Sequence, residues 1–177
     1  MTNLSQDQTQ DSRPGLALFE PEIATNVAAL IRLAACLAVP LHLIEPLGFV
    51  MDDRRLRRVA MDYLDRVVLV RHDSFRAFND WRADAGRRLV VLAGDAPTSH
   101  LETVFRRDDL LLAGRESDGL PPDVRAAADL AASVPLAPGN RSLNVVVACT
   151  LVLGEALRQT GAFPDRSPPH PAWPRRG

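Results

Sequence analysis

Short apolar segments, each followed by a stretch with helical periodicity, recur along this chain of 177 residues. A strand that is buried on both faces forms a continuous apolar run, whereas a half-exposed strand alternates between apolar and polar residues. Parallel strands require long crossover connections, and helices supply them. The alternation therefore predicts an α/β fold, with a parallel sheet covered by helices on both faces. Its strands are expected at residues 15–19, 41–44, 66–70, 88–93, 110–113 and 132–136.

The helical segments lie between these strands. The spacing of apolar residues predicts helices at residues 26–38, 74–85, 122–128 and 143–160, with short ones at 54–60 and 100–105. Thr25 is a candidate N-cap for the first helix, Ser74 opens the second long one, and Gly161 ends the last. The last helix is apolar on almost every side, which indicates burial in the domain or in a subunit interface.

The length of the chain suits one domain. We expect residues 1–14, which are polar, to form a disordered N-terminal tail. Residues 15–162 form the predicted domain. Residues 163–177 are rich in proline and are expected to form a second tail, because proline cannot continue a helix.

Composition argues against several classes of protein. No apolar run reaches the roughly 18–20 residues of a membrane span, and the polar N-terminus lacks the apolar core of a secretory signal. Cys36 and Cys149 are too few and too isolated for a disulfide framework or a zinc site. The histidines show no metal-binding spacing, and His42 is expected to be a hydrogen-bonded core or edge residue. These features predict a cytoplasmic protein without a metal and without a membrane partner.

The net charge of −1 gives no global reason to expect nucleic acid as a partner. The positive charge is nevertheless carried entirely by arginine, which can bind phosphate through two hydrogen bonds. One run, DDRRLRR, concentrates it at Arg54, Arg55, Arg57 and Arg58. A solvated helix face is the usual explanation for such a run.

Small residues gather where a ligand would bind. In open α/β sheets, ligands lie beyond the carboxyl ends of the strands. Loops of small residues follow Leu92 and Ala113 and precede Ser142. Gly114 and Gly119 permit close backbone approach, although the glycine patterns of dinucleotide and P-loop sites are absent. The sequence predicts a small-molecule crevice, and a tight turn with a solvated Glu116 is the alternative for the middle loop.

Three ordered motifs point to a family. They are EPEI at residues 20–23 with Asn26 and Arg32 after it, GRESDGLP at residues 114–121, and RSLN at residues 141–144. With these motifs the chain resembles the SPOUT class of RNA methyltransferases over roughly residues 15–163. It is most similar to the bacterial enzymes that methylate the ribose 2′-oxygen of the tRNA wobble nucleotide.

The resemblance implies a fold and an activity that spacing alone does not give. It implies a SPOUT-type sheet with a C-terminal trefoil knot that holds S-adenosylmethionine in a bent form. It also implies a homodimer with the active site at the subunit interface. The expected substrate is the anticodon stem-loop of tRNA, in which the ribose 2′-hydroxyl of a wobble cytidine or modified uridine would be methylated.

The resemblance also assigns residues to roles. Arg32 and Asn144 are the expected catalytic residues, and Arg32 would assist deprotonation of the hydroxyl or hold the adjacent phosphate; otherwise it is a surface arginine. The four arginines of residues 54–58 become expected tRNA phosphate contacts. Leu92 and Leu136 are alternatively core residues at strand ends. The residues expected to bind the cofactor are Leu92, Gly114, Glu116, Gly119, Leu136 and Ser142.

The chain departs from the commonest family pattern at residues 27–29, at residues 93–96, where Asp95 replaces a cation, and at Ser117 and Asp118. These departures favour an alternative, a degenerate SPOUT paralogue that binds cofactor or RNA without methylating the wobble ribose. A third possibility, an unrelated α/β cofactor module, requires all three motifs to be coincidental.

Overall fold

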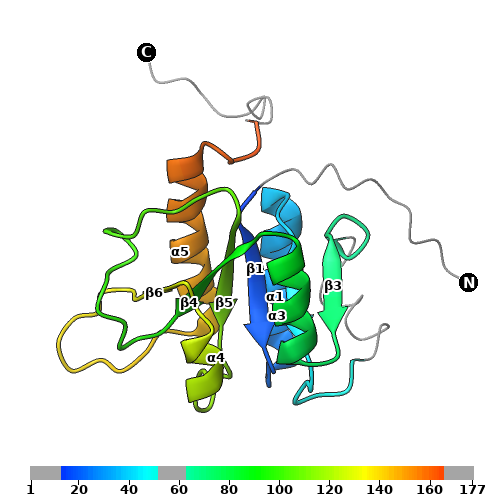
Figure 1. Cartoon of the computed structure of the whole chain (residues 1–177), viewed down its shortest axis with the longest axis horizontal. Coiled ribbons are helices and arrows are strands. Elements are labelled where there is room, and N and C mark those ends of the chain that lie inside the picture. The colour runs from blue at the N-terminus through cyan, green and yellow to red at the C-terminus, as the bar shows by residue number, and fades with distance from the viewer. Residues whose placement is uncertain (1–12, 52–62, 166–177) are drawn as a thin grey trace, which may run out of the picture.

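The computed structural model describes residues 13–51 and 63–165, and within them the core is a six-stranded, entirely parallel sheet (Figure 1). The strand order is β3-β2-β1-β5-β4-β6. This sheet confirms the predicted α/β architecture. The strands are β1 (Gly15–Phe19), β2 (Leu41–Ile44), β3 (Leu69–His72), β4 (Arg88–Leu92), β5 (Asp109–Ala113) and β6 (Leu130–Ala132).

Helices cover both faces of the sheet, as predicted. α1 (Ala24–Leu37) and α5 (Val145–Thr160) bury apolar side chains in one core, and α3 (Phe75–Asp84) and α4 (Pro122–Ala126) pack into the other (Figure 1). Successive side chains of each central strand point into opposite cores, because the pleat alternates direction. The apolar residues of β1 and residues 110–113 of β5 are therefore buried on both sides.

Two helix ends follow their predicted signals. The Ser74 hydroxyl accepts a hydrogen bond from the Ala77 amide and caps α3. Gly161 ends α5 with a φ of 60°, a left-handed conformation that glycine adopts without steric cost. The predicted N-cap of the first helix is wrong. α1 starts at Ala24, so Thr25 lies inside it, and Ile23 precedes it without a side-chain cap.

Two strands are displaced from their predicted positions. β3 begins at Leu69 rather than residue 66, because the Arg66 and Val67 amides bond back to the Tyr63 carbonyl in a turn. β6 ends at Ala132 and does not span the expected residues 132–136; the Ser133 amide instead donates to the Thr98 carbonyl and the chain leaves the sheet.

The helix expected at residues 100–105 is wrong: that segment consists of turns and irregular chain. The one expected at residues 54–60 and both tails, apart from residues 13–14 and 163–165, lie outside the described residues. No helix in residues 13–51 and 63–165 is long and apolar enough to cross a membrane.

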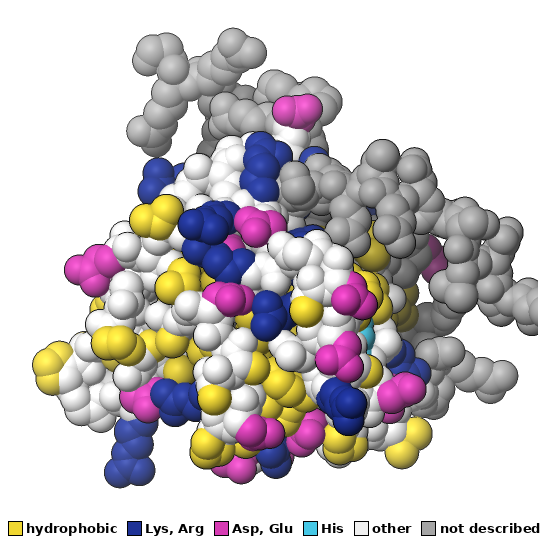
Figure 2. All heavy atoms as spheres, viewed as in Figure 1, with side chains coloured by type: hydrophobic (Ala, Val, Ile, Leu, Met, Phe, Trp, Pro, Cys, Tyr) yellow, Lys and Arg dark blue, Asp and Glu magenta, His cyan; other side chains and the backbone are white. Residues whose placement is uncertain are grey.

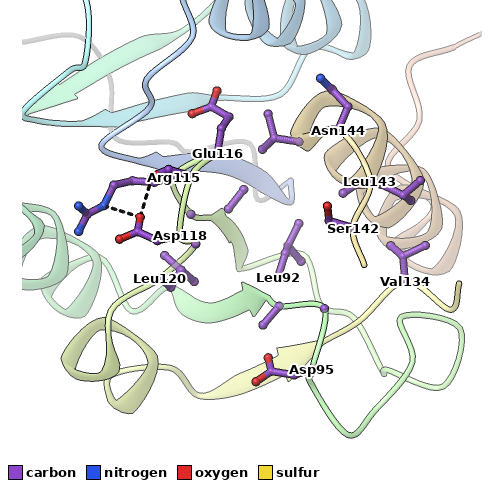
Figure 3. Close-up of a pocket in the computed structure, with 18 of the residues that line it drawn as sticks. Leu92, Asp95, Arg115, Glu116, Asp118, Leu120, Val134, Ser142, Leu143 and Asn144 are labelled. Atoms are coloured by element: carbon purple, nitrogen blue, oxygen red, sulfur yellow. Dashed lines mark hydrogen bonds and ion pairs between the residues drawn. The ribbon is translucent and has the colours of Figure 1, made fainter. Parts of the chain in front are cut away.

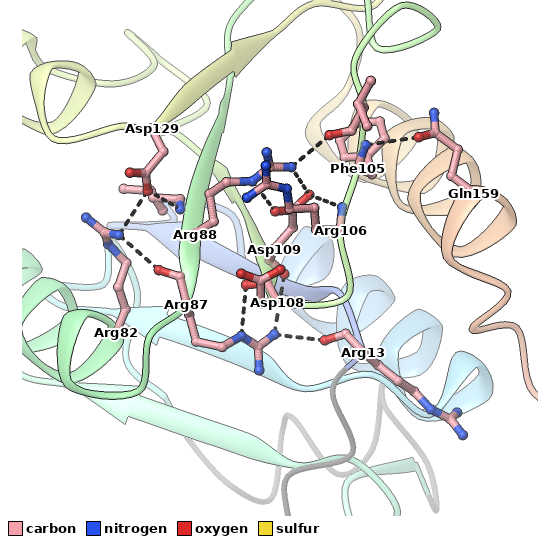
Figure 4. A network of polar contacts seen from close by, with 12 residues as sticks. Arg13, Arg82, Arg87, Arg88, Phe105, Arg106, Asp108, Asp109, Asp129 and Gln159 are labelled. Atoms are coloured by element: carbon pink, nitrogen blue, oxygen red, sulfur yellow. Dashed lines mark hydrogen bonds and ion pairs between the residues drawn. The ribbon is translucent and has the colours of Figure 1, made fainter.

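A buried polar network lies at the amino-terminal ends of β4 and β5 (Figure 4). The fully buried Asp109 carboxylate accepts hydrogen bonds from Arg88 Nε at 2.6 Å and Nη2 at 2.8 Å, and from the Arg106 amide at 2.8 Å. Beside it, Arg87 donates to the carbonyls of Asp108 and Arg13 at 3.0 and 2.8 Å. Charge-assisted bonds of this kind hold both partners in one geometry, so they fix the start of β4 against the start of β5.

Two histidines pair inside the second core. His42 Nδ1 on β2 lies 3.0 Å from His72 Nε2 on β3, and both rings pack against Phe78 and Trp81 of α3. Burial, with smaller contributions from His72 and Arg87, lowers the pKa of His42 to about 3. The pair is therefore neutral at pH 7, with one ring donating to the other, and His42 is the hydrogen-bonded core residue that the sequence suggested.

The histidine pair should make the fold sensitive to acid. The folded pKa of His42 lies below the unfolded value of 6.5, so stability is complete above pH 6.5 and falls as the pH drops toward 3. Between pH 7 and pH 5, protonation of this group in the unfolded state should reduce the free energy of unfolding by roughly 2 kcal/mol. Urea denaturation of the wild type and of His42→Gln at both pH values measures this, and the variant should lose correspondingly less. Equal losses in the two proteins would contradict the assignment.

Candidate functional site

A cavity of about 680 Å³ opens at the carboxyl ends of β4, β5 and β6. Three loops form it: residues 93–95 after β4, residues 114–120 after β5, and residues 133–144 after β6 (Figure 3). Its volume is within the range of small-molecule sites. The crevice therefore lies where the small-residue loops predicted it.

The cavity brings together most of the predicted site residues. Asn144 lines it at the start of α5, whereas Arg32 does not line it. Arg32 is exposed on α1, with its guanidinium carbon 5.1 Å from the centre of the Tyr63 ring. The four arginines of residues 54–58 lie outside the described residues. All six residues expected to bind the cofactor line the cavity: Leu92, Gly114, Glu116, Gly119, Leu136 and Ser142.

The middle loop closes on itself through its two glycines. The Arg115 amide donates to the Gly119 carbonyl, and the Gly119 amide donates to the Arg115 carbonyl, both at 3.0 Å. A Cβ atom on Gly114 would lie 2.3 Å from the Gly119 carbonyl carbon and 2.7 Å from the Leu120 nitrogen. Gly119 itself has a φ of 73°. Both positions therefore require glycine, because a side chain at either one would clash or be strained.

A chain of polar side chains connects the loops along the cavity wall. Asn26 Nδ2 donates to Glu116 Oε1 at 3.0 Å, and Asn144 Nδ2 donates to Asn26 Oδ1 at 3.2 Å. Asn144 Oδ1 accepts from the Val146 amide at 2.8 Å and so caps α5. Asn26 thus joins two predicted site residues, although its place in the first motif is its sole sequence signal and gives it no predicted role.

The two acidic departures from the family pattern each lie beside an arginine. Asp95 Oδ1 lies 2.7 Å from Arg125 Nη2, and this hydrogen bond lowers the pKa of Asp95. Asp118 Oδ1 lies 3.5 Å from Arg115 Nε, which is equally close to Glu20 Oε2. On the face drawn in Figure 2, basic and acidic side chains also lie next to one another. Asp95 therefore adds no unpaired negative charge to the cavity, whereas Asp118 shares Arg115 with Glu20.

The lining combines two kinds of surface. Leu92, Val134 and Val152 supply apolar side chains, while the loop backbones and Ser142 supply hydrogen-bonding groups. This arrangement suits a small molecule that has both an apolar part and hydrogen-bonding groups. Within residues 13–51 and 63–165, no group of three His, Cys, Asp or Glu side chains is placed to hold a metal ion.

The close contact between Gly114 and Gly119 predicts that alanine disturbs the structure at Gly114 but is tolerated at Gly154. Gly114→Ala should force residues 114–120 apart and speed amide hydrogen exchange at Arg115 and Gly119, because the added methyl meets backbone atoms. Gly154→Ala is the matched control, since its Cβ would meet nothing within 4 Å in the interior of α5. It should stabilise the protein by about 0.5–1 kcal/mol. Unchanged exchange in Gly114→Ala would contradict the close packing of Gly114 against Gly119.

Comparison with known proteins gives a consistent result. The model of the SpoU rRNA Methylase family matches residues 14–154. A protein of Beijerinckia indica named tRNA (cytidine(34)-2'-O)-methyltransferase is 53% identical over 148 residues, which cover 84% of this chain and 92% of the relative. The Escherichia coli K12 protein of the same name is 38% identical, covering 82% and 93%.

Solved structures agree with these relatives. One described as giving structural insights into the 2-OH methylation of C/U34 on tRNA has a TM-score of 0.78 and 40% identity, covering 83% of this chain and 95% of that one. The SpoU methyltransferase AviRb of Streptomyces viridochromogenes in complex with AdoMet has a TM-score of 0.76 and 28% identity, covering 86% and 62%. The resemblance to SPOUT methyltransferases is thereby confirmed, and the chain belongs to the SpoU rRNA methylase family.

Proposed function

We propose that this protein transfers a methyl group from S-adenosylmethionine to the ribose 2′-hydroxyl of the wobble nucleotide, cytidine or a modified uridine, in the anticodon loop of tRNA. The observation that carries the proposal is the meeting of all three family motifs around one cavity. The names of the relatives in Beijerinckia indica and Escherichia coli support this choice of substrate.

The cavity fits the proposed cofactor. An adenosyl group presents a flat ring and a polar ribose, which match the apolar side chains and the backbone groups of the loops. Bound S-adenosylmethionine would supply an electrophilic methyl group. We assign cofactor contacts to the backbones of Leu92, Gly114, Leu136 and Ser142. Glu116 and Gly119 would keep the middle loop in shape.

We further propose that the C-terminal loops form a trefoil knot. The supporting feature is the path of the chain after β6. β6 lies at one edge of the sheet, yet the following segment lines the cavity and leads into α5, which packs against the central strands β1 and β5. Such a return across the loop ends is what a knot around the cofactor requires.

The acceptor side of the reaction needs groups that act on a weak nucleophile. A ribose hydroxyl is a poor nucleophile at neutral pH, so a positioned base or cation aids its attack. We assign this role to Arg32, and we assign Asn144 to placing the acceptor beside the donor loop. Arg32 lies outside this copy's own cavity, which accords with an active site completed by a second copy.

A homodimer is therefore part of the proposal. Val147 and Leu151 are one turn apart on α5, and each leaves 45% of its surface exposed. Apolar side chains left exposed on a helix whose opposite face is buried in the core are typical of an interface between subunits. α5 and α1, which carries Arg32, cover the same face of the sheet, so an interface on α5 would place the arginine near the partner.

The remaining assignments concern RNA and organisation. We propose that Arg54, Arg55, Arg57 and Arg58 bind tRNA phosphates, which would make binding weaken steeply with salt. Residues 15–162 would be the methyltransferase domain, with residues 1–14 and 163–177 as its tails. The proposed place of action is the cytoplasm, where tRNA is modified.

A methyl-transfer assay tests the function. Purified protein, labelled S-adenosylmethionine and unmodified tRNA should give a 2′-O-methyl nucleotide at position 34 after nuclease digestion. Arg32→Ala should lower the rate by about a hundredfold or more, because a positioned acid–base group contributes that much. Its affinity for S-adenosylmethionine should stay unchanged. Arg76→Ala is the control, since Arg76 is 91% exposed on α3, on the other face of the sheet.

Two results would contradict the proposal. Full activity of Arg32→Ala would remove the arginine from the acceptor site. Absence of methylated tRNA from a wild-type protein that binds S-adenosylmethionine would instead support the degenerate paralogue.

A further inference from the structure

The turn between β1 and α1 is held in an unusual conformation beside the cavity. Glu20, the first residue after β1, has a φ of 45°, which non-glycine residues rarely adopt. Its amide donates to the Ile44 carbonyl at 2.9 Å. Gly48, in the loop that follows β2, packs closely against this turn: a Cβ atom on Gly48 would lie 2.8 Å from Glu22 Cα. Such backbone strain persists only where the surroundings fix the chain firmly, and it concentrates at functional sites.

Glu22 connects this turn to the middle loop in both directions. The Glu22 amide donates to Glu116 Oε2 at 2.8 Å. In return, Glu22 Oε2 accepts from the Ser117 amide at 2.8 Å, and Glu22 Oε1 accepts from Ser117 Oγ at 2.9 Å. We call this set of three hydrogen bonds the Glu22 clasp. It joins segments that are 94 and 95 residues apart in sequence.

Glu22 contacts residues of the cavity wall without lining the cavity itself. Glu116 and Ser117 line the cavity, whereas Glu22 does not. Asn26, in the first turn of α1, donates to the other oxygen of Glu116. Two donors within residues 22–26 therefore orient the Glu116 carboxylate, and the Glu22 carboxylate holds the next residue of the loop, Ser117.

We propose that Glu22 is a positioning residue for the proposed reaction: through the Glu22 clasp it holds residues 114–120 in the shape that binds the adenosyl cofactor. The inference rests on the proposed function for the identity of the ligand. A carboxylate that accepts two hydrogen bonds gives this clasp enough strength to order a loop, because bonds to charged groups are the stronger ones. Ser117, one of the departures from the family pattern, acquires a role as the partner of Glu22.

Binding of S-adenosylhomocysteine, the product of the proposed cofactor, provides the test. Glu22→Ala should weaken its affinity roughly tenfold, as expected for loss of charge-assisted hydrogen bonds that order the site. Glu22→Gln keeps an acceptor oxygen and should give an intermediate affinity. Glu102→Ala is the matched control: the Glu102 carboxylate also accepts from a serine amide, that of Ser99 at 3.4 Å, but it lies outside the cavity wall. It should bind like the wild type.

A double variant separates positioning from general loss of structure. Ser117→Ala removes the hydroxyl that bonds to Glu22 from an exposed loop residue and should weaken binding by about threefold. Combined with Glu22→Ala it should add almost nothing, because the partner is already gone. Amide hydrogen exchange at Ser117, measured without ligand, should quicken in Glu22→Ala and stay unchanged in Glu102→Ala.

The outcomes distinguish this inference from the proposed function. If the wild type binds S-adenosylhomocysteine and Glu22→Ala binds it within twofold of the wild type, the positioning role is wrong and the proposed function stands. Full additivity of Glu22→Ala and Ser117→Ala would also overturn the role. If the wild type fails to bind the compound, the proposed function and this inference fall together.

Discussion

The parallel pairing of β4 with β5 is the constraint on which the site depends. Five residues of β4 match five of β5, from Arg88 opposite Asp109 to Leu92 opposite Ala113. The buried contact of Arg88 with Asp109 fixes this register at the amino-terminal edge. Because the two strands are parallel, the loops that follow them leave the sheet side by side at its carboxyl-terminal end. The cavity forms there, and the loop from β6 closes its third side.

The sequence predicts those parts of the fold that follow from burial. β1, β2 and β5 are buried on both faces, so their mostly apolar sequences identify them almost to the residue. The edge strands are less well marked. Val134 and Leu136 look like a continuation of β6, but both residues line the cavity instead. An apolar residue that faces a ligand site and one that faces the core have the same pattern, which explains the displaced sixth strand.

The candidate site also has features that the sequence predicts and features that only the folded structure reveals. Gly114 and Gly119 stand out in the sequence because small residues permit close approach, and the structure gives the physical reason: a Cβ atom on Gly114 would lie only 2.3 Å from the Gly119 carbonyl carbon. The Glu22 clasp and the contact of Asn26 with Glu116 could not be predicted, because they join residues at least 90 positions apart. The pairing of Asp95 with Arg125 is equally hidden, and it alters the meaning of a residue that the sequence marks as an unfavourable negative charge. Spacing identifies which residues lie on one element, whereas topology decides which elements meet.

A crystal structure with S-adenosylhomocysteine tests the central claim most directly, namely that the loops after β4, β5 and β6 form a ready-made cofactor site. The account predicts the ligand inside the cavity bounded by Leu92, Gly114 and Ser142, with loop backbones displaced by less than about 1 Å, as in other pre-organised sites. It also predicts that the hydrogen bonds from Ser117 to Glu22 and from Asn26 to Glu116 persist. A ligand bound elsewhere, or loops that open and break these bonds, would contradict it.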